Sequence, residues 1–274
     1  MTVTAGSDWV ETLSEGLGTG NPWYYYPLVV GAILGAWAVG HAFGRRRHDP
    51  NAADRVIDHV NAVQTALIGL LSLMIAFTFS LSLNRFEARR AAVLTEATAI
   101  GEASQRAALL PPIRAAAAAR LLADYIQARI EFGNEGGRTS RGKLLVDRSL
   151  AIQSALWAQA MASSEEDRAR PPTSLYITAL VGLSERHEER LTADHNQVPL
   201  AVFFTLYALA MLGTGYSGYA AGVKGARGAI SNALLAIAIA TVITLIADLD
   251  TPGSGLVNIS QQPLMDLQKA PLTH

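Results

Sequence analysis

The chain has 274 residues, of which about half are hydrophobic and only 16% are charged, with a formal net charge of −1 and no cysteine. A soluble domain carries about a quarter charged residues, so this composition favours a protein whose helices lie in a bilayer. The near-zero charge removes the electrostatic basis for nucleic-acid binding, and the lack of cysteine excludes disulfides, thiolate metal sites and cysteine nucleophiles.

An acidic, polar N-terminal tail is predicted over residues 1–22. It carries Asp8, Glu11 and Glu15 but no Lys or Arg. A secretory signal needs a basic segment before its apolar core, so the first apolar run is interpreted as a retained membrane span. That span is predicted over residues 24–43 and begins in the aromatic stretch WYYY. Tryptophan and tyrosine are enriched where helices leave the bilayer.

Three more apolar runs reach the length of about 20 residues that a helix needs to cross the hydrocarbon core. They cover residues 63–83, 199–219 and 229–249. Two transmembrane hairpins are therefore predicted, over residues 23–84 and 197–249, followed by a C-terminal tail over residues 250–274.

The segment between the hairpins, residues 85–196, is predicted to form a helical extramembrane domain. The stretch NRFEARRAAVLTEATAIGEASQRAALL, from Asn84 to Leu110, extends the second span as one rod until Pro111 and Pro112 stop it. Alanine and leucine, which favour helix strongly, are frequent in the segments that follow. The predicted fold class is all-α: a four-span helical membrane protein with a helical extramembrane domain between spans 2 and 3.

Small residues recur four apart in the predicted spans, a spacing that lets two helix backbones approach closely in lipid. The pairs are Gly31 and Gly35, Gly40 and Gly44, and Gly218 and Gly222. The alternative is that glycine is simply common in membrane helices, and no oligomeric state is inferred from these pairs.

Acidic and histidine residues of the middle segment offer no complete active site. Glu96 and Glu102 are six apart and do not share a helix face well, and no nucleophile–base pair or phosphate-binding loop appears, so the protein is predicted not to be an enzyme. His187 and His195 share one face of a charged helix, where a solvated surface is favoured over a metal site.

Asp248 and Asp250, at the end of the fourth span, are the candidate metal ligands. Two carboxylates beside the TPGSG loop could hold Ca²⁺, the one cofactor considered. Because two carboxylates make an incomplete shell, the favoured interpretation is that Asp248 marks the membrane boundary and Asp250 opens a turn.

Three motifs carry a resemblance to a known family. They are LMIAFTFSLSLNRFEARR, EATAIGEASQRAALLPP and DLDTPGSGLVNISQQPL, and the similarity extends from about residue 60 to 267. Together they resemble the bacterial DUF4239 family, also called bestrophin-like, and the last motif is the most specific. The resemblance implies a multi-pass protein of the bacterial inner membrane.

A more distant resemblance links the LNRFEARR junction to true bestrophins, which are pentameric ion channels whose second spans line the pore. It implies a homo-oligomer, a pentamer, and places Gly69, Leu73 and Phe77 at the pore neck. These residues are four apart and share one helix face. A lipid-facing or bundle-core stripe is the alternative. Gly69 also departs from the bulky neck pattern, which argues for a wider constriction or none.

The charged cluster after the second span admits two interpretations. Arg85, Glu87, Arg89 and Arg90 could form a ring that concentrates anions at a pore mouth. The favoured interpretation is anchoring, in which Arg85 and Arg89 reach the headgroups and Glu87 pairs with Arg90 at i,i+3. A subunit contact through Glu87 or Glu96 is compatible with both.

Two indications of membrane sidedness disagree. Arg45, Arg46, Arg47 and Arg55 lie in a short loop, which favours a cytoplasmic loop and an external helical domain. The family resemblance implies a cytoplasmic domain, and it is slightly preferred because long segments blur the charge rule.

The sequence thus supports two functions. The first is a bestrophin-like homo-oligomer that conducts small ions passively through a pore lined by the second span. The alternative is a non-conducting membrane scaffold or sensor that binds a protein partner through its helical domain. In both, the lipid bilayer is the surrounding medium.

Overall fold

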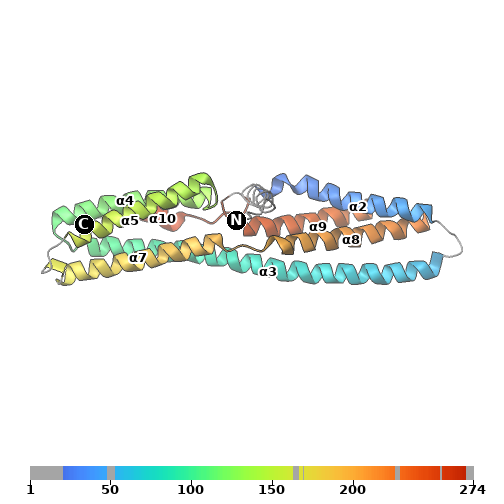
Figure 1. Cartoon of the computed structure of the whole chain (residues 1–274), viewed down its shortest axis with the longest axis horizontal. Coiled ribbons are helices and arrows are strands. Elements are labelled where there is room, and N and C mark those ends of the chain that lie inside the picture. The colour runs from blue at the N-terminus through green and yellow to red at the C-terminus, as the bar shows by residue number, and fades with distance from the viewer. Residues whose placement is uncertain are drawn as a thin grey trace, which may run out of the picture. The chain divides into compact units, whose positions relative to one another are not determined.

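The computed structural model describes residues 21–47, 53–162, 167–168, 170–225, 229–253 and 255–269. Within these ranges every regular element is a helix (Figure 1). In chain order they are η1 (Pro22–Tyr24), α2 (Tyr26–Arg46), α3 (Ala53–Ala107), α4 (Pro112–Glu135), α5 (Ser140–Met161), α7 (Pro171–His195), α8 (Leu200–Lys224), α9 (Ala229–Asp250) and α10 (Gln262–Lys269).

The chain divides into two compact units. Unit 1 combines the described residues of Met1–Asn84 and Val198–Thr251, and unit 2 those of Arg85–Gln197 and Pro252–His274. Helix α3 contributes to both, since it runs without a break through the apolar span and the charged segment that follows. The predicted rod-like extension of the second span is therefore present, and Gly101 does not interrupt it.

Unit 1 contains the apolar helices. Four helical stretches of the described chain are long and apolar enough to cross a membrane, within Tyr26–Arg46, Ala62–Ala107, Pro171–Lys224 and Ile230–Asp250. In the third stretch the apolar part is α8, which carries no charged residue before Lys224. These helices confirm the predicted all-α, four-span architecture. Their side chains meet in a core that includes Ile33, Leu71, Leu206 and Ile243.

Helices α2 and α8 approach closely through glycine. A Cβ added at Gly40 would collide with the backbone carbonyl of Gly215, and one added at Gly218 would collide with that of Trp37. The close approach predicted from the glycine spacing is thus present at these positions, and also at Gly44 and Gly222. It is not present at Gly31 and Gly35, where an added Cβ would meet nothing within 4 Å.

Unit 2 is a helical bundle with its own apolar core. The last part of α3 presents Val93, Ala97 and Ile100 to the bundle, and α4, α5, α7 and α10 supply the other core residues. They include Leu122, Tyr125, Leu156, Tyr176, Leu183 and Leu264. The C-terminal segment is part of this unit, because Leu264 of α10 is fully buried in the core.

Candidate functional site

The predicted pore face of α3 is open in the single chain. Leu73 is 52% exposed and Phe77 66% exposed, and a Cβ added at Gly69 would meet nothing within 4 Å. The opposite side of the same helix is buried through Leu71, Thr78 and Ser82, at i, i+7 and i+11. The α3 span therefore has one face packed on its own bundle and one face that the described residues leave uncovered.

Two hydroxyl groups of the α3 span bond to their own helix. Ser72 Oγ donates to the carbonyl of Ile68 at 2.8 Å, and Thr78 Oγ1 donates to the carbonyl of Met74 at 2.7 Å. This back-bonding satisfies a hydroxyl without a partner helix. These two side chains are accounted for locally, whereas Ser80 is exposed on the uncovered face.

The charged cluster after the span contains both exposed and buried side chains. Glu87 and Arg90 are exposed and form the predicted i,i+3 ion pair, with 3.9 Å between Oε2 and Nη1. Arg89 is only 3% exposed. A headgroup anchor keeps its charged end in water, so the anchoring role predicted for Arg89 is wrong for the chain as folded. Arg85 is half-buried.

Asp250 acts as a backbone acceptor. Its Oδ1 and Oδ2 accept the amide of Val198 at 3.1 and 2.9 Å. Asp248 is 1% exposed. Among the described residues, no group of three or more His, Cys, Asp or Glu side chains is placed to hold a metal ion. Asp250 thus has a structural role as the acceptor of the Val198 amide.

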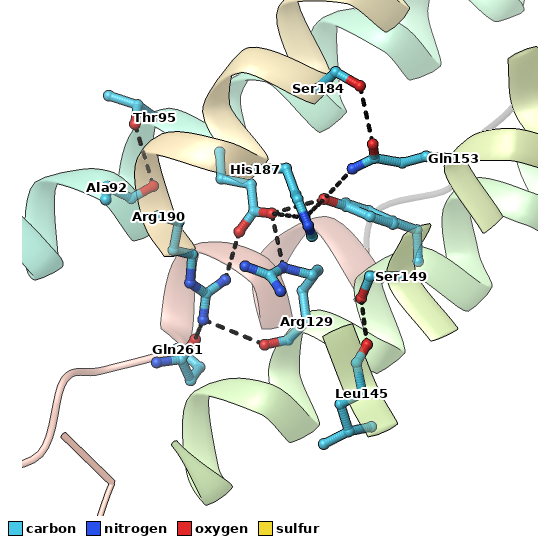
Figure 2. Close-up of polar contacts among 12 residues, drawn as sticks. Ala92, Thr95, Arg129, Leu145, Ser149, Gln153, Ser184, His187, Arg190 and Gln261 are labelled. Atoms are coloured by element: carbon cyan, nitrogen blue, oxygen red, sulfur yellow. Dashed lines mark hydrogen bonds and ion pairs between the residues drawn. The ribbon is translucent and has the colours of Figure 1, made fainter. Parts of the chain in front are cut away.

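Unit 2 contains a cluster of buried polar side chains, which we call the Glu96 network. It is the densest group of hydrogen-bonded buried side chains among the described residues. Its members are Glu96 of α3, Tyr125 and Arg129 of α4, Gln153 of α5, His187 and Arg190 of α7, and Gln261, which precedes α10. Helix periodicity brings them together, because Tyr125 and Arg129 are four apart and His187 and Arg190 three apart. Figure 2 shows Arg129, from α4, converging with His187 and Arg190, both from α7.

Glu96 is the centre of this network and is fully buried. Its Oε1 accepts Arg129 Nε at 2.7 Å and the Tyr125 hydroxyl at 2.8 Å, and its Oε2 accepts Arg190 Nη1 at 2.6 Å. Charge-assisted bonds of this length are the strong class of protein hydrogen bond. One carboxylate thus bonds to two helices other than its own.

The hydrogen bonds around Tyr125 fix the tautomer of His187. The single hydroxyl proton of Tyr125 goes to Glu96, so the Tyr125 oxygen acts as an acceptor toward its other neighbours. Gln153 Nε2 donates to it at 3.1 Å, and His187 Nδ1 lies 2.9 Å away and must donate as well. Ser184 orients the Gln153 amide by donating to its oxygen at 2.9 Å. His187 therefore carries its proton on Nδ1.

Electrostatics hold Glu96 in its ionised form. Burial by itself would raise the pKa of Glu96, but the charges of Arg129 and Arg190 outweigh burial and lower that pKa well below its ordinary value. Burial, and then the Glu96 charge, raise the pKa of Tyr125 well above its ordinary value, so the phenol stays protonated as a donor.

The C-terminal segment joins this network through Gln261. Arg190 Nη2 donates to Gln261 Oε1 at 2.9 Å, and Gln261 Nε2 donates to the carbonyl of Ile259 at 3.0 Å. The Gln261 amide lies against Gly133 of α4, where an added Cβ would overlap it. Gln261 belongs to the motif DLDTPGSGLVNISQQPL, so this contact gives part of that motif a structural role.

Sequence patterns indicated individual members but not the network. A subunit contact through Glu96 is wrong because its side chain is fully buried, and a solvated His187 is wrong for the same reason. His195 is exposed as expected. One available signal was the position of Glu96 in the stripe of Val93, Ala97 and Ile100, because a carboxylate in an apolar stripe is buried only if it is paired.

Comparison with known proteins assigns a family and a fold. The family model described as the bestrophin-like domain matches residues 28–264, most of the chain. A crystal structure of a membrane protein is similar with a TM-score of 0.60 and 13% identity, over 91% of this chain and 99% of that one. At this identity the likeness is one of fold. Among curated proteins no sequence matches the chain.

Proposed function

We propose, from the premise that the chain belongs to the bestrophin-like family, that it assembles in the membrane as a homo-oligomer and lets small ions pass along its second spans. The distant resemblance to bestrophins supplies the stoichiometry, a pentamer. It also supplies the path, which is the face of α3 that carries Gly69, Leu73 and Phe77.

The composition of the uncovered α3 face is the observation that carries the proposal. Gly69, Leu73, Ala76 and Ser80 follow one another at i, i+4, i+7 and i+11, all exposed, with Phe77 beside them. Small and hydroxyl side chains are used where helices meet or where water lines a path. A face that only touched lipid tails would gain little from them.

Leu73 and Phe77 provide the constriction in this proposal. Symmetry-related copies of two large apolar side chains form a ring that can gate by excluding water. Gly69, one turn away, has no side chain to narrow the path. The constriction is therefore limited to about one helical turn at the Leu73–Phe77 level, and a smaller side chain at either position widens it.

Ion flux from liposomes that contain the purified full chain tests the proposal. We expect Phe77→Ala to increase passive flux, because it removes the widest side chain of the ring. Phe204→Ala is the matched control, since Phe204 is 67% exposed on α8 and lies off the proposed path. No flux from the parent or from Phe77→Ala, across a range of pH, calcium and voltage, overturns the channel.

Single cysteines distinguish a water-lined face from a lipid-facing one. The parent has no cysteine, so Ser80→Cys and, as control, Leu212→Cys each introduce one thiol. Leu212 is 53% exposed on α8. A charged, membrane-impermeant thiol reagent is expected to modify Ser80→Cys and spare Leu212→Cys. A non-conducting scaffold, the alternative function, would assemble through the same face yet protect both thiols and give no flux.

Membrane placement is part of the same proposal. The family resemblance supports a bacterial inner membrane with the helical domain, residues 85–196, in the cytoplasm. A reporter fused at the C-terminus, which belongs to unit 2, reads this placement directly. Activity of a reporter that works only outside the cytoplasm would overturn it.

A further inference from the structure

Arg129 has the least satisfied side chain of the Glu96 network. It is fully buried, and its Nε donates to Glu96 at 2.7 Å. Its other two nitrogens, Nη1 and Nη2, are also buried, and no acceptor among the described residues bonds to either. Four N–H groups of a permanently charged side chain thus lie inside the bundle without a protein partner.

Phe132 and Glu96 restrict where a partner for these groups can lie. The Arg129 guanidinium carbon stands 4.4 Å from the centroid of the Phe132 ring, so one face of the guanidinium plane is covered by an aromatic ring. The Nε edge is occupied by Glu96. What remains is the edge formed by Nη1 and Nη2, the fork that bonds bidentately to carboxylate-like anions.

Charge balance indicates the kind of partner. Two guanidiniums, of Arg129 and Arg190, bond directly to a single carboxylate, Glu96, so these ion pairs leave one positive charge in excess. Asp194, another buried carboxylate of unit 2, accepts the amide of Gly137 at 3.0 Å and forms no ion pair with either arginine. A buried, uncompensated charge is unfavourable unless an ion of opposite sign accompanies it.

We propose that the Glu96 network is an anion site, in which a small monovalent anion bonds to the Nη1 and Nη2 edge of Arg129. The ligand is of the chloride or small planar oxyanion class, such as formate or nitrate, because one negative charge balances the cluster and the buried position favours a small ion. The site lies in unit 2, whereas Gly69, Leu73 and Phe77 of the proposed conduction path belong to unit 1.

The test measures how anions change the thermal unfolding of the full chain in detergent. The protein is exchanged into sodium gluconate, whose anion is large, and then titrated with chloride, nitrate or formate at constant ionic strength. The unfolding temperature of the parent is expected to rise with the logarithm of anion concentration, because a ligand that binds only the folded state stabilises it. Titration calorimetry of the same samples gives the dissociation constant.

Variants separate an anion site from a purely structural arginine. Arg129→Met is expected to lose the anion dependence, whereas Arg186→Gln, at an exposed arginine, changes the net charge equally and keeps it. Glu96→Gln removes a negative charge next to the site and is expected to tighten anion binding about tenfold or more. A structural role for Arg129 alone would lower stability in these variants without altering any anion affinity.

Each outcome decides the question. Chloride as effective as the oxyanions indicates a spherical ion in the fork, and a preference for formate and nitrate indicates bidentate planar binding; both support the site. Equal anion dependence in the parent, Arg129→Met and Arg186→Gln overturns it and leaves buried water as the partner of Arg129. If Arg129→Met does not fold, Arg129→Lys replaces it. An anion affinity that is unchanged in Glu96→Gln also overturns the site. None of these readouts needs ion flux, so failure here and failure of the channel are distinguishable.

Discussion

Replacing Glu96 with glutamine removes one negative charge from the centre of unit 2 and keeps the size of the side chain. Arg129 and Arg190 then remain buried with no carboxylate between them. The new amide nitrogen also directs its N–H donors toward the N–H donors of the arginines. Breaking a buried ion pair by removing one partner costs about 3–5 kcal/mol of the free energy of unfolding. Glu96 accepts from both arginines, at 2.7 and 2.6 Å, so we expect a loss within that range.

Thermal unfolding of the purified full chain measures this loss. For a chain of this size, 1 kcal/mol shifts the unfolding temperature by about 2–4 °C, so Glu96→Gln should lower it by about 6–20 °C. Glu102→Gln is the matched control, since Glu102 lies on the same helix in an exposed pair with Arg106 at 3.5 Å. An exposed i,i+4 pair contributes about 0.5 kcal/mol or less, hence a shift of about 2 °C or less.

Acid pH adds a second readout of the same contacts. The pKa of Glu96 in the folded chain lies well below its ordinary value of 4.5, so its contribution to stability is complete above pH 4.5 and is lost as the pH falls. The gap in unfolding temperature between the parent and Glu96→Gln should therefore be constant above pH 4.5 and shrink below it. Equal unfolding temperatures for Glu96→Gln and Glu102→Gln, or a gap that does not change with pH, would refute the reasoning.

Two further predictions use glycine positions that differ in the space around them. Gly218→Ala should destabilise the membrane unit by about 1–3 kcal/mol or more, because the added methyl meets backbone of α2; Gly35→Ala, with open space, should leave the unfolding temperature in detergent nearly unchanged. Gly133→Ala should displace the amide of Gln261 and loosen the C-terminal segment, seen as faster limited proteolysis near the C-terminus. Gly182→Ala, where nothing lies within 4 Å, should leave the rate of this proteolysis unchanged. Equal cleavage rates for Gly133→Ala and Gly182→Ala would contradict the contact between Gly133 and Gln261.

The sequence by itself determined the fold class and the membrane spans. A backbone in lipid must satisfy its hydrogen bonds internally, so an apolar run of about 20 residues is committed to a helix wherever it later packs. The continuity of α3 followed from the same local cause, since no proline occurs from Ala53 to Ala107. The Glu87–Arg90 pair was predictable because both residues lie within one turn of one helix.

Only the tertiary structure decided which polar residues are buried together. Arg129 and Arg190 reach Glu96 from positions 33 and 94 residues away in the chain, and Gln261 reaches Arg190 across 71 residues. Spacing within a helix cannot report such contacts, because they depend on how separate helices pack. The local sequence pattern therefore predicted a solvated His187 and an anchoring Arg89. Packing buries both side chains, because helices distant in sequence exclude water from them.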